Sequence, residues 1–286
     1  MTGESGWRKA AGTDHITNNN IGSRSVGRLD GKRIIITGAG TGIGEASAIR
    51  VASEGAKVLV VGRTEETISD TVDQIRNAGG TAEYLIADAT VEEQVAGMVS
   101  TCVDRFGGLD VFYANAGNTE RMTPLLDMTV DQWEQQFRDN VISAFLCVKY
   151  AGRHMVDHGG GSIILCSSVA SLRANGGAIA YSAVKAGVNS LTQTAAAAFI
   201  GKNIRVNALL PGLAETKLSK PIFEYARNKG SEHKLGKLTL MQRPGYVEDM
   251  AGVIAFLASD DSSYVDGQLI ACDGGISATH PFGRFA

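Results

Sequence analysis

Residues 33–45 read RIIITGAGTGIGE, and this stretch decides the fold. Ile34, Ile35 and Ile36 are β-branched and form a short apolar run that suits a buried strand. Four glycines follow, at positions 38, 40, 42 and 44, and residues 46–54 read as a helix. This order of strand, glycine-rich turn and helix binds the pyrophosphate of a dinucleotide, because free backbone N–H groups and the helix dipole attract phosphate there. Glycine lets the phosphate approach without a Cβ in the way.

The rest of the chain alternates strands with helices. Each expected strand is a nearly continuous apolar run, which is typical of a parallel sheet that is covered on both faces. Because crossovers between parallel strands are right-handed, we expect one Rossmann-type α/β domain with a doubly wound parallel sheet and helices on both faces. The expected strands are 34–36, 57–62, 82–87, 109–114, 162–166, 204–209 and 268–271, and the expected helices are 46–54, 65–77, 91–106, 130–157, 181–201 and 247–259.

The length of 286 residues suffices for a single large domain of this kind, which we place at 29–286. Residues 1–28 are polar and rich in Gly, Ser and Asn, so we expect a flexible N-terminal extension. Residues 213–242 carry many charges and little periodicity just past a strand end, where ligands bind in open α/β sheets. We interpret them as a substrate lid, with an ordinary surface loop as the alternative.

Charge and cysteine content narrow the function. The net charge is −3 without a long run of one sign, which argues against nucleic acid or a membrane as a partner. No stretch approaches the length of a membrane-spanning helix. The four cysteines are far apart and join no histidine cluster, so we expect neither a metal site nor a disulfide framework. Free thiols are typical of a reducing compartment, and we expect a cytoplasmic protein.

Tyr181, Lys185 and Ser168 are the candidates for chemistry. Tyr181 and Lys185 are four residues apart and share one face of the expected helix. A nearby cation stabilises a phenolate and lowers the pKa of the tyrosine, although a surface tyrosine beside a lysine gives the same spacing. Ser168 follows a strand end, and strand ends and helix starts meet at one edge of the sheet. Its hydroxyl can therefore hold a substrate carbonyl oxygen beside Tyr181, whereas strand alternation points Ser167 the other way.

Several motifs together resemble the short-chain dehydrogenase/reductase family. They are T-G-x-x-x-G-I-G at 37–44, N-A-G at 115–117, Asn140, Ser168, Y-x-x-x-K at 181–185 and P-G at 211–212, in family order over about 29–276. The resemblance implies that Asn140, Ser168, Tyr181 and Lys185 are catalytic, without a metal. Tyr181 is then the general acid in reduction and the base in oxidation. Lys185 lowers its pKa and holds the nicotinamide ribose, Ser168 orients the substrate, and Asn140 keeps a water in a relay to Lys185.

The resemblance also implies where the cofactor binds. Asp88 resembles the residue that hydrogen-bonds the adenine amino group, with a helix N-cap as its competing role. Thr216 resembles the residue that binds the carboxamide, and Asn115 and Gly117 support the adenine-ribose side. The implied cofactor-binding residues are Gly38, Thr41, Gly42, Ile43, Gly44, Arg63, Asp88, Ala89, Asn115, Ala116, Gly117, Tyr181, Lys185, Pro211, Gly212 and Thr216.

The end of the second strand decides between NADP and NAD. Enzymes that use NAD usually place an acid there, which accepts from the ribose 2′-OH. Here that position is Gly62, and Arg63 follows with a guanidinium that can pair with a 2′-phosphate. We therefore favour NADP(H). NAD(H) stays possible, because Thr41 stands where many NADP enzymes have a second basic residue.

The sequence thus predicts an oxidoreductase that transfers a hydride reversibly between NADP(H) and a small-molecule ketone/secondary alcohol pair. A 3-oxoacyl-carrier-protein reductase-like enzyme is one alternative. A non-catalytic dinucleotide-sensing regulatory protein on the same fold is another, although it would not need all four catalytic residues. The resemblance further implies a homotetramer.

Overall fold

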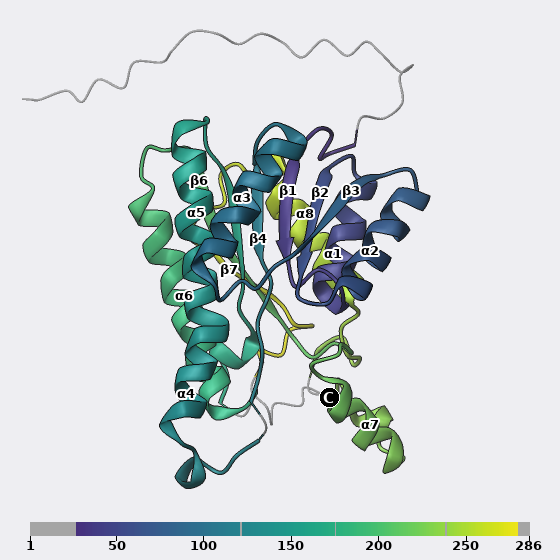
Figure 1. Ribbon diagram of the computed structural model, residues 1–286. Coiled ribbons are helices and arrows are strands. Elements are labelled where there is room, and N and C mark those ends of the chain that lie inside the picture. The colour runs from purple at the N-terminus through teal and green to yellow at the C-terminus, as the bar shows by residue number, and fades with distance from the viewer. Residues whose placement is uncertain (1–26, 121, 175, 238, 280–286) are drawn as a thin grey trace, which may run out of the picture.

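The computed structural model describes residues 27–279 apart from residues 121, 175 and 238 (Figure 1). Its strands are β1 (Arg33–Thr37), β2 (Lys57–Gly62), β3 (Thr81–Ile86), β4 (Val111–Ala114), β5 (Gly161–Cys166), β6 (Ile204–Pro211) and β7 (Leu269–Cys272). Its longer helices are α1 (Gly42–Ser53), α2 (Glu65–Asn77), α3 (Glu92–Phe106), α4 (Val130–Phe137), α5 (Ser143–Asp157), α6 (Ile179–Ala198), α7 (Lys220–Asn228) and α8 (Val247–Ala258).

The seven strands form one parallel sheet in the order β3-β2-β1-β4-β5-β6-β7. β1 is central, and its Ile35 pairs with Leu59 of β2 on one side and Phe112 of β4 on the other. The chain runs outward from β1 to β3 and then returns to place β4 beside β1. This reversal creates a topological switch point at the carboxyl ends of β1 and β4, where open α/β sheets bind ligands. The predicted doubly wound sheet is confirmed.

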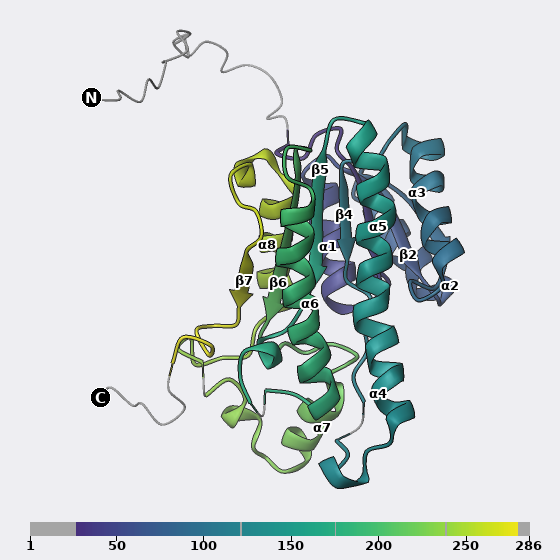
Figure 2. The same cartoon turned by 90° about the vertical axis from the view of Figure 1, so that its left-hand side faces the viewer.

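Alternation along β1 feeds two hydrophobic cores. Ile34 and Ile36 are fully buried on the face that α1, α2 and α8 cover. Ile35 is fully buried on the opposite face, which α3, α5 and α6 cover. A side chain on a strand alternates between faces, so three consecutive isoleucines stay buried only if helices lie on both sides. Figure 2 shows the sheet between these two layers, with α4 and α7 beyond the carboxyl ends of the strands.

Several helix boundaries differ from the sequence prediction, by up to three residues in α6 (Ile179–Ala198 instead of 181–201), and two larger differences concern the site. α1 begins at Gly42 instead of residue 46, because the glycine-rich turn runs directly into the first helical turn. The helical run expected over 130–157 is broken into α4 and α5 by a π-helical turn at Arg138–Ile142. In that turn the side-chain amide of Asn140 donates to the carbonyl of Gln136, at 3.0 Å. This is the i−4 carbonyl that a backbone N–H takes in a regular α-helix, so the side chain occupies the acceptor where the ladder widens.

The two predicted flanking segments differ in how much is described. Of the extension expected at 1–28, residues 1–26 lie outside the described residues, whereas Arg28 pairs with Glu54 at 2.8 Å. The expected lid at 213–242 contains α7, and its Arg227 bonds both Glu215 carboxylate oxygens, at 2.7 and 2.6 Å, and also Glu232. Within the described ranges, no helix combines the length and apolar character that a membrane crossing needs.

Candidate active site

The glycine-rich turn after β1 has a backbone that only glycine fits at three positions. Gly38 and Gly42 have φ of +64° and +60°, in the left-handed region that side chains disfavour. Gly44 has no room, since a Cβ there would lie 2.3 Å from the carbonyl oxygen of Gly38 and 2.6 Å from Nδ2 of Asn115. The turn is therefore tight and packed against the loop that follows β4.

Asn115 joins the glycine turn to β4. Its side-chain amide donates to the carbonyls of Thr37 and Gly38, at 3.0 and 3.2 Å. In return, Oγ1 of Thr37 accepts from the backbone N–H groups of Asn115 and Ala116, both at 3.1 Å. The sequence identified Asn115 but not this use of the Thr37 hydroxyl, because nothing in the motif spacing says that a buried threonine faces the next strand.

The start of α1 has the properties of a phosphate-binding site. Thr41 is its N-cap residue and is exposed, and its side chain makes no capping hydrogen bond in the described part of the chain. The amides at Gly42 and Ile43 therefore lie at a positive helix end without a side-chain cap. Thr216 lies over this turn, since a Cβ at Gly42 would be 3.2 Å from Cβ of Thr216. These features fit the pyrophosphate of a dinucleotide.

The loop after β6 completes that side of the site. Pro211 ends β6, and the N–H of Gly212 donates to the carbonyl of Cys272, at 2.9 Å. A Cβ at Gly212 would lie 2.7 Å from Cα of Asp273, so this glycine too is set by close packing. The chain then turns toward α1, where the N–H of Thr216 donates to Oγ of Ser219, at 2.9 Å.

Asp88 and Ala89 lie at the carboxyl end of β3, beside Arg63. The Asp88 carboxylate accepts from the N–H and the hydroxyl of Thr90, both at 2.8 Å. Arg63 approaches the same carboxylate at 3.6 Å. Burial raises the pKa of Asp88, but the Thr90 hydrogen bonds and Arg63 outweigh it, so the net pKa is lowered. Since Val91 is the N-cap residue of α3, Asp88 does not take the competing N-cap role.

Ser168 is buried directly after β5. It caps the short 3-10 helix Val169–Ser171, and its Oγ accepts from the N–H of Ala170 at 3.1 Å. Ser167 faces away as expected, because its hydroxyl donates to the carbonyl of Lys185, at 3.0 Å. The adjacent serines therefore have different surroundings, and the Ser168 hydroxyl lowers the pKa of Tyr181.

α6 carries Tyr181 and Lys185 one turn apart. Nζ of Lys185 lies 5.4 Å from the centre of the Tyr181 ring and donates to the carbonyl of Cys166 at 2.8 Å. Gly117 lies against the same ammonium, since a Cβ there would be 3.2 Å from Nζ. That Cβ would also be 2.8 Å from Oδ1 of Asn140. The structure thus brings all four expected catalytic side chains together around the loop that follows β4.

Burial dominates the titration of this pair. It raises the pKa of Tyr181 well above its ordinary value of 10, against a lowering by the Ser168 hydrogen bond. Burial also lowers the pKa of Lys185. The sequence argument expected Lys185 to lower the pKa of Tyr181. In the structure the net direction is upward, because desolvation of the phenolate is the larger effect.

Sequence reasoning missed Glu120. Its carboxylate accepts from the N–H groups of Ala180 and Tyr181, at the start of α6. The two segments are about sixty positions apart, and no motif spacing connects an acid in one loop with the start of a distant helix. Residues that could hold a metal are not gathered in the described ranges, where no group of three or more His, Cys, Asp or Glu has suitable positions.

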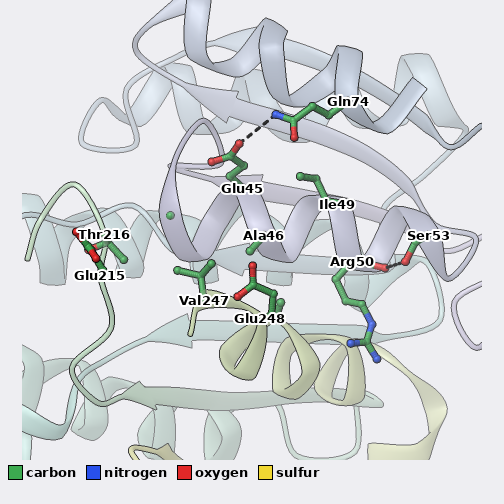
Figure 3. Close-up of a pocket in the computed structure, with 12 residues that line it drawn as sticks. Glu45, Ala46, Ile49, Arg50, Ser53, Gln74, Glu215, Thr216, Val247 and Glu248 are labelled. Carbon is green, nitrogen blue, oxygen red and sulfur yellow. Dashed lines mark hydrogen bonds between the residues drawn. The ribbon is translucent and has the colours of Figure 1, made fainter. Parts of the chain in front are cut away.

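A groove of about 510 Å³ runs between α1 and α8 on the outer side of this site (Figure 3). At one end Glu215 and Thr216 lie on the loop after β6, and at the other end lie Arg50 and Ser53. The Glu45 carboxylate accepts from the side chain of Gln74 across its rim, at 3.1 Å. The groove touches the cofactor turn through Gly42 and Thr216 but does not include the tyrosine or the lysine.

Comparison with known proteins agrees with this fold. Residues 38–277 match the family model described as enoyl-(acyl carrier protein) reductase. A cis-4-hydroxycyclohexanecarboxylate dehydrogenase from Sinomonas cyclohexanicum is 38% identical over 245 residues, 85% of this chain and 96% of the relative. A short-chain type dehydrogenase/reductase from Mycobacterium marinum superposes with a TM-score of 0.81 at 34% identity, over 88% of this chain and 97% of that chain. A third similar structure is a protein assigned as an NAD(P)-dependent gluconate 5-dehydrogenase from Beutenbergia cavernae, solved with NADP bound at low occupancy. Its TM-score is 0.79 at 34% identity, and the match covers 88% of this chain and 98% of that chain.

Replacing Gly44 by alanine tests the packing of the glycine turn. The new Cβ would meet backbone, which cannot move aside cheaply, so we expect a loss of about 1–3 kcal/mol in the free energy of unfolding and weaker dinucleotide binding. Gly97→Ala in the middle of α3 is the matched control, because a Cβ there meets nothing within 4 Å and should stabilise the helix slightly. Thermal melts and NADPH titrations measure both. A Gly44→Ala protein that melts and binds like wild type would contradict the packing argument.

Proposed function

The chain belongs to the short-chain dehydrogenase/reductase family, and we propose that it uses NADP(H), with Tyr181 as the proton donor and acceptor. As a member it is an NAD(P)-dependent oxidoreductase that transfers a hydride between an alcohol and a ketone. The observation that carries the proposal is the gathering of Tyr181, Ser168, Lys185 and Asn140 around the loop that follows β4. Asn140 lies before α5, Ser168 follows β5, and Tyr181 and Lys185 lie one turn apart on α6. Gly117 nevertheless lies against both Asn140 and Lys185.

Tyr181 and Ser168 act on the substrate oxygen in this proposal. Both hydroxyls donate hydrogen bonds to the carbonyl oxygen, which orients it and stabilises the negative charge that develops during reduction. Tyr181 then gives its proton to that oxygen, and in oxidation it takes the proton of the alcohol. The bound nicotinamide supplies or accepts the hydride.

Lys185 and Asn140 assist the proton transfer of Tyr181. The Lys185 ammonium, 5.4 Å from the ring, favours the phenolate over the phenol when a proton has been given away. Its bond to the carbonyl of Cys166 holds it there. Asn140 presents Oδ1 beside the same loop, and its amide nitrogen donates to the carbonyl of Asn118 at 3.0 Å. This fixed orientation suits a residue that holds a water for a proton relay to Lys185.

The proposed preference for NADP depends on Gly62 and Arg63. An acid at position 62 would be hard to accommodate, because a Cβ there would lie 2.6 Å from Cγ2 of Ile68. The Arg63 side chain is 72% exposed and only loosely paired with Asp88, so its guanidinium is accessible to a ribose 2′-phosphate. NADP in the Beutenbergia cavernae neighbour is consistent with this preference.

For the substrate we propose a ring-bearing or partly apolar ketone and its secondary alcohol. The Sinomonas cyclohexanicum relative is named for a secondary alcohol on a cyclohexane ring. A carrier-bound acyl substrate is the second candidate, because the matching family model is described by an acyl carrier protein reductase.

We also propose a cytoplasmic homotetramer. All four cysteines are free thiols, which suits a reducing compartment. Exposed apolar side chains on α4 and α5, Trp133, Phe137 and Phe145, are suited to contact with another copy. Light scattering of the purified protein measures the oligomeric state.

Tyr181→Phe tests the catalytic assignment. The wild-type enzyme should oxidise NADPH with one class of ketone in a panel of cyclic, linear and carrier-bound substrates. Loss of the hydroxyl should lower turnover by about 10²–10⁴-fold, the usual contribution of a general acid, while NADPH binding is retained. Tyr264→Phe is the control, since Tyr264 is fully exposed. Retained turnover in Tyr181→Phe would overturn the mechanism, and cofactor binding without turnover of any substrate would favour a sensing role.

The pH dependence should differ between the two directions. Because the pKa of Tyr181 is raised, its protonated form predominates at neutral pH and its deprotonated form is gained only as pH rises. Ketone reduction needs the protonated form and should be flat through neutral pH. Alcohol oxidation needs the deprotonated form and should keep rising into the alkaline range. Initial rates over pH, with the fold checked by circular dichroism, measure this, and an oxidation rate that falls above neutral pH would contradict it.

Arg63→Ala tests the cofactor preference. Removing a charge-assisted pair with the 2′-phosphate should raise KM for NADPH about tenfold or more and leave KM for NADH nearly unchanged. Arg105→Ala on α3 is the control, because Arg105 is an exposed arginine paired with Glu83 away from this end of β2. Equal effects of Arg63→Ala on both cofactors would show that Arg63 does not read the 2′-phosphate.

A further inference from the structure

α6, the helix that carries Tyr181, lacks a cap of its own. Its N-cap residue is Ala178, which has no side chain able to accept a hydrogen bond. The carboxylate of Glu120, in a loop far away in the sequence, acts as the cap instead. Oε1 accepts from the N–H of Ala180 at 2.9 Å and of Tyr181 at 3.3 Å, and Oε2 accepts from Tyr181 at 3.2 Å. These are the second and third N–H groups of the helix, the ones that a cap residue normally satisfies.

Glu120 is itself held by a buried amide. Gln136 of α4 is 3% exposed. When its amide is oriented so that both ends find partners, the side-chain nitrogen donates to Oε2 of Glu120 at 3.2 Å and to the carbonyl of Asn118 at 3.1 Å, while the oxygen accepts from the N–H of Glu120 at 3.2 Å. Asn118 also accepts from the side chain of Asn140. One continuous set of hydrogen bonds therefore runs from Asn140 to the backbone of Tyr181.

We propose that Glu120 is a positioning residue for Tyr181, which fixes the first turn of α6 and adds a negative charge that opposes the phenolate. This inference rests on the proposed role of Tyr181 as the acid and base. A fixed first turn holds the phenol in register with Ser168.

The charges around Tyr181 determine the sign of the effect. The titratable groups that face it in the described part of the chain are Glu120, Cys166 of β5 and Lys185 of its own helix. Burial raises the pKa of Tyr181 most, and Cys166 and then Glu120 raise it further, whereas the Lys185 ammonium favours the phenolate. Removal of the Glu120 charge therefore leaves Lys185 less opposed, and the phenolate forms at lower pH.

Two variants separate the two roles. Glu120→Gln removes the charge but keeps an oxygen that can accept from the helix, whereas Glu120→Ala removes both. Glu134→Gln, on the exposed side of α4, is the matched control. Amide hydrogen exchange at Ala180 and Tyr181 should become roughly fivefold faster in Glu120→Ala, with a smaller change in Glu120→Gln and none in the control.

A direct titration reads the charge effect. The ultraviolet phenolate signal of Tyr181, isolated by subtracting the Tyr181→Phe spectrum, should move to lower pH in both Glu120 variants. The pH profile of alcohol oxidation should move in the same direction. A role in folding alone would lower the melting temperature without moving either curve.

These measurements keep the two proposals separate. Absence of turnover in the wild-type enzyme would refute the proposed function, while exchange and the absorbance titration would still decide the role of Glu120. Unchanged exchange in Glu120→Ala and an unchanged Tyr181 titration in Glu120→Gln would overturn the inference. If Glu120→Ala does not fold, Glu120→Gln alone decides it, since that variant keeps the acceptor.

Discussion

The side-chain amide of Asn115 is the contact on which the rest of the site depends. It bonds two successive carbonyls at the end of β1 and lies 2.6 Å from where a Cβ of Gly44 would be. The glycine turn is thereby held against the loop after β4, at the switch point where the connections that follow the parallel strands β1 and β4 lead to opposite sides of the sheet. Because the start of α1 is fixed by this contact, its N–H groups are held where we propose that the phosphates bind.

The same loop also contacts the proposed catalytic residues. Two residues after Asn115, Gly117 approaches both Asn140 and Lys185, and its lack of a side chain is what allows them to come together. Three residues further, the carboxylate of Glu120 accepts a hydrogen bond from the N–H of Ala180 at the start of α6. The cofactor turn and the catalytic helix are thus held by one short segment, and the distance between them is set by its backbone. Rigid placement of this kind is what gives hydride and proton transfer their effective concentration.

Much of the fold could be predicted from the sequence, because burial leaves a clear pattern. Strands of β-branched residues between glycine turns indicate a parallel sheet, and the expected ranges of β2 and α2 agree with the structure to the residue. The break at Arg138–Ile142 could not be predicted in this way, since its residues continue a helical pattern and only the side chain of Asn140 makes the difference. Such a local competition between a side chain and the backbone is invisible to periodicity.

Part of the candidate site could likewise be predicted from the sequence, and part could not. Tyr181, Lys185 and Ser168 could be predicted, because a helix face and a strand end fix where they lie. The pKa of Tyr181 could not, since the net direction depends on how completely the phenol is buried. Glu120 could not be found either, because its partners are backbone N–H groups, which every sequence has.

The electrostatics of the pair follow from burial more than from pairing. Burial disfavours both charged forms, raising the pKa of Tyr181 and lowering that of Lys185, so it opposes the ion pair that proton donation creates. In addition to burial, individual neighbouring groups favour or oppose one of the two charged forms. Ser168 favours the phenolate and the carbonyl of Cys166 holds the ammonium, whereas Glu120 opposes the phenolate. Because these groups share one network, changes in them are not expected to add, and the loop 115–120 both positions Tyr181 and contributes, through Glu120, to the charge around it.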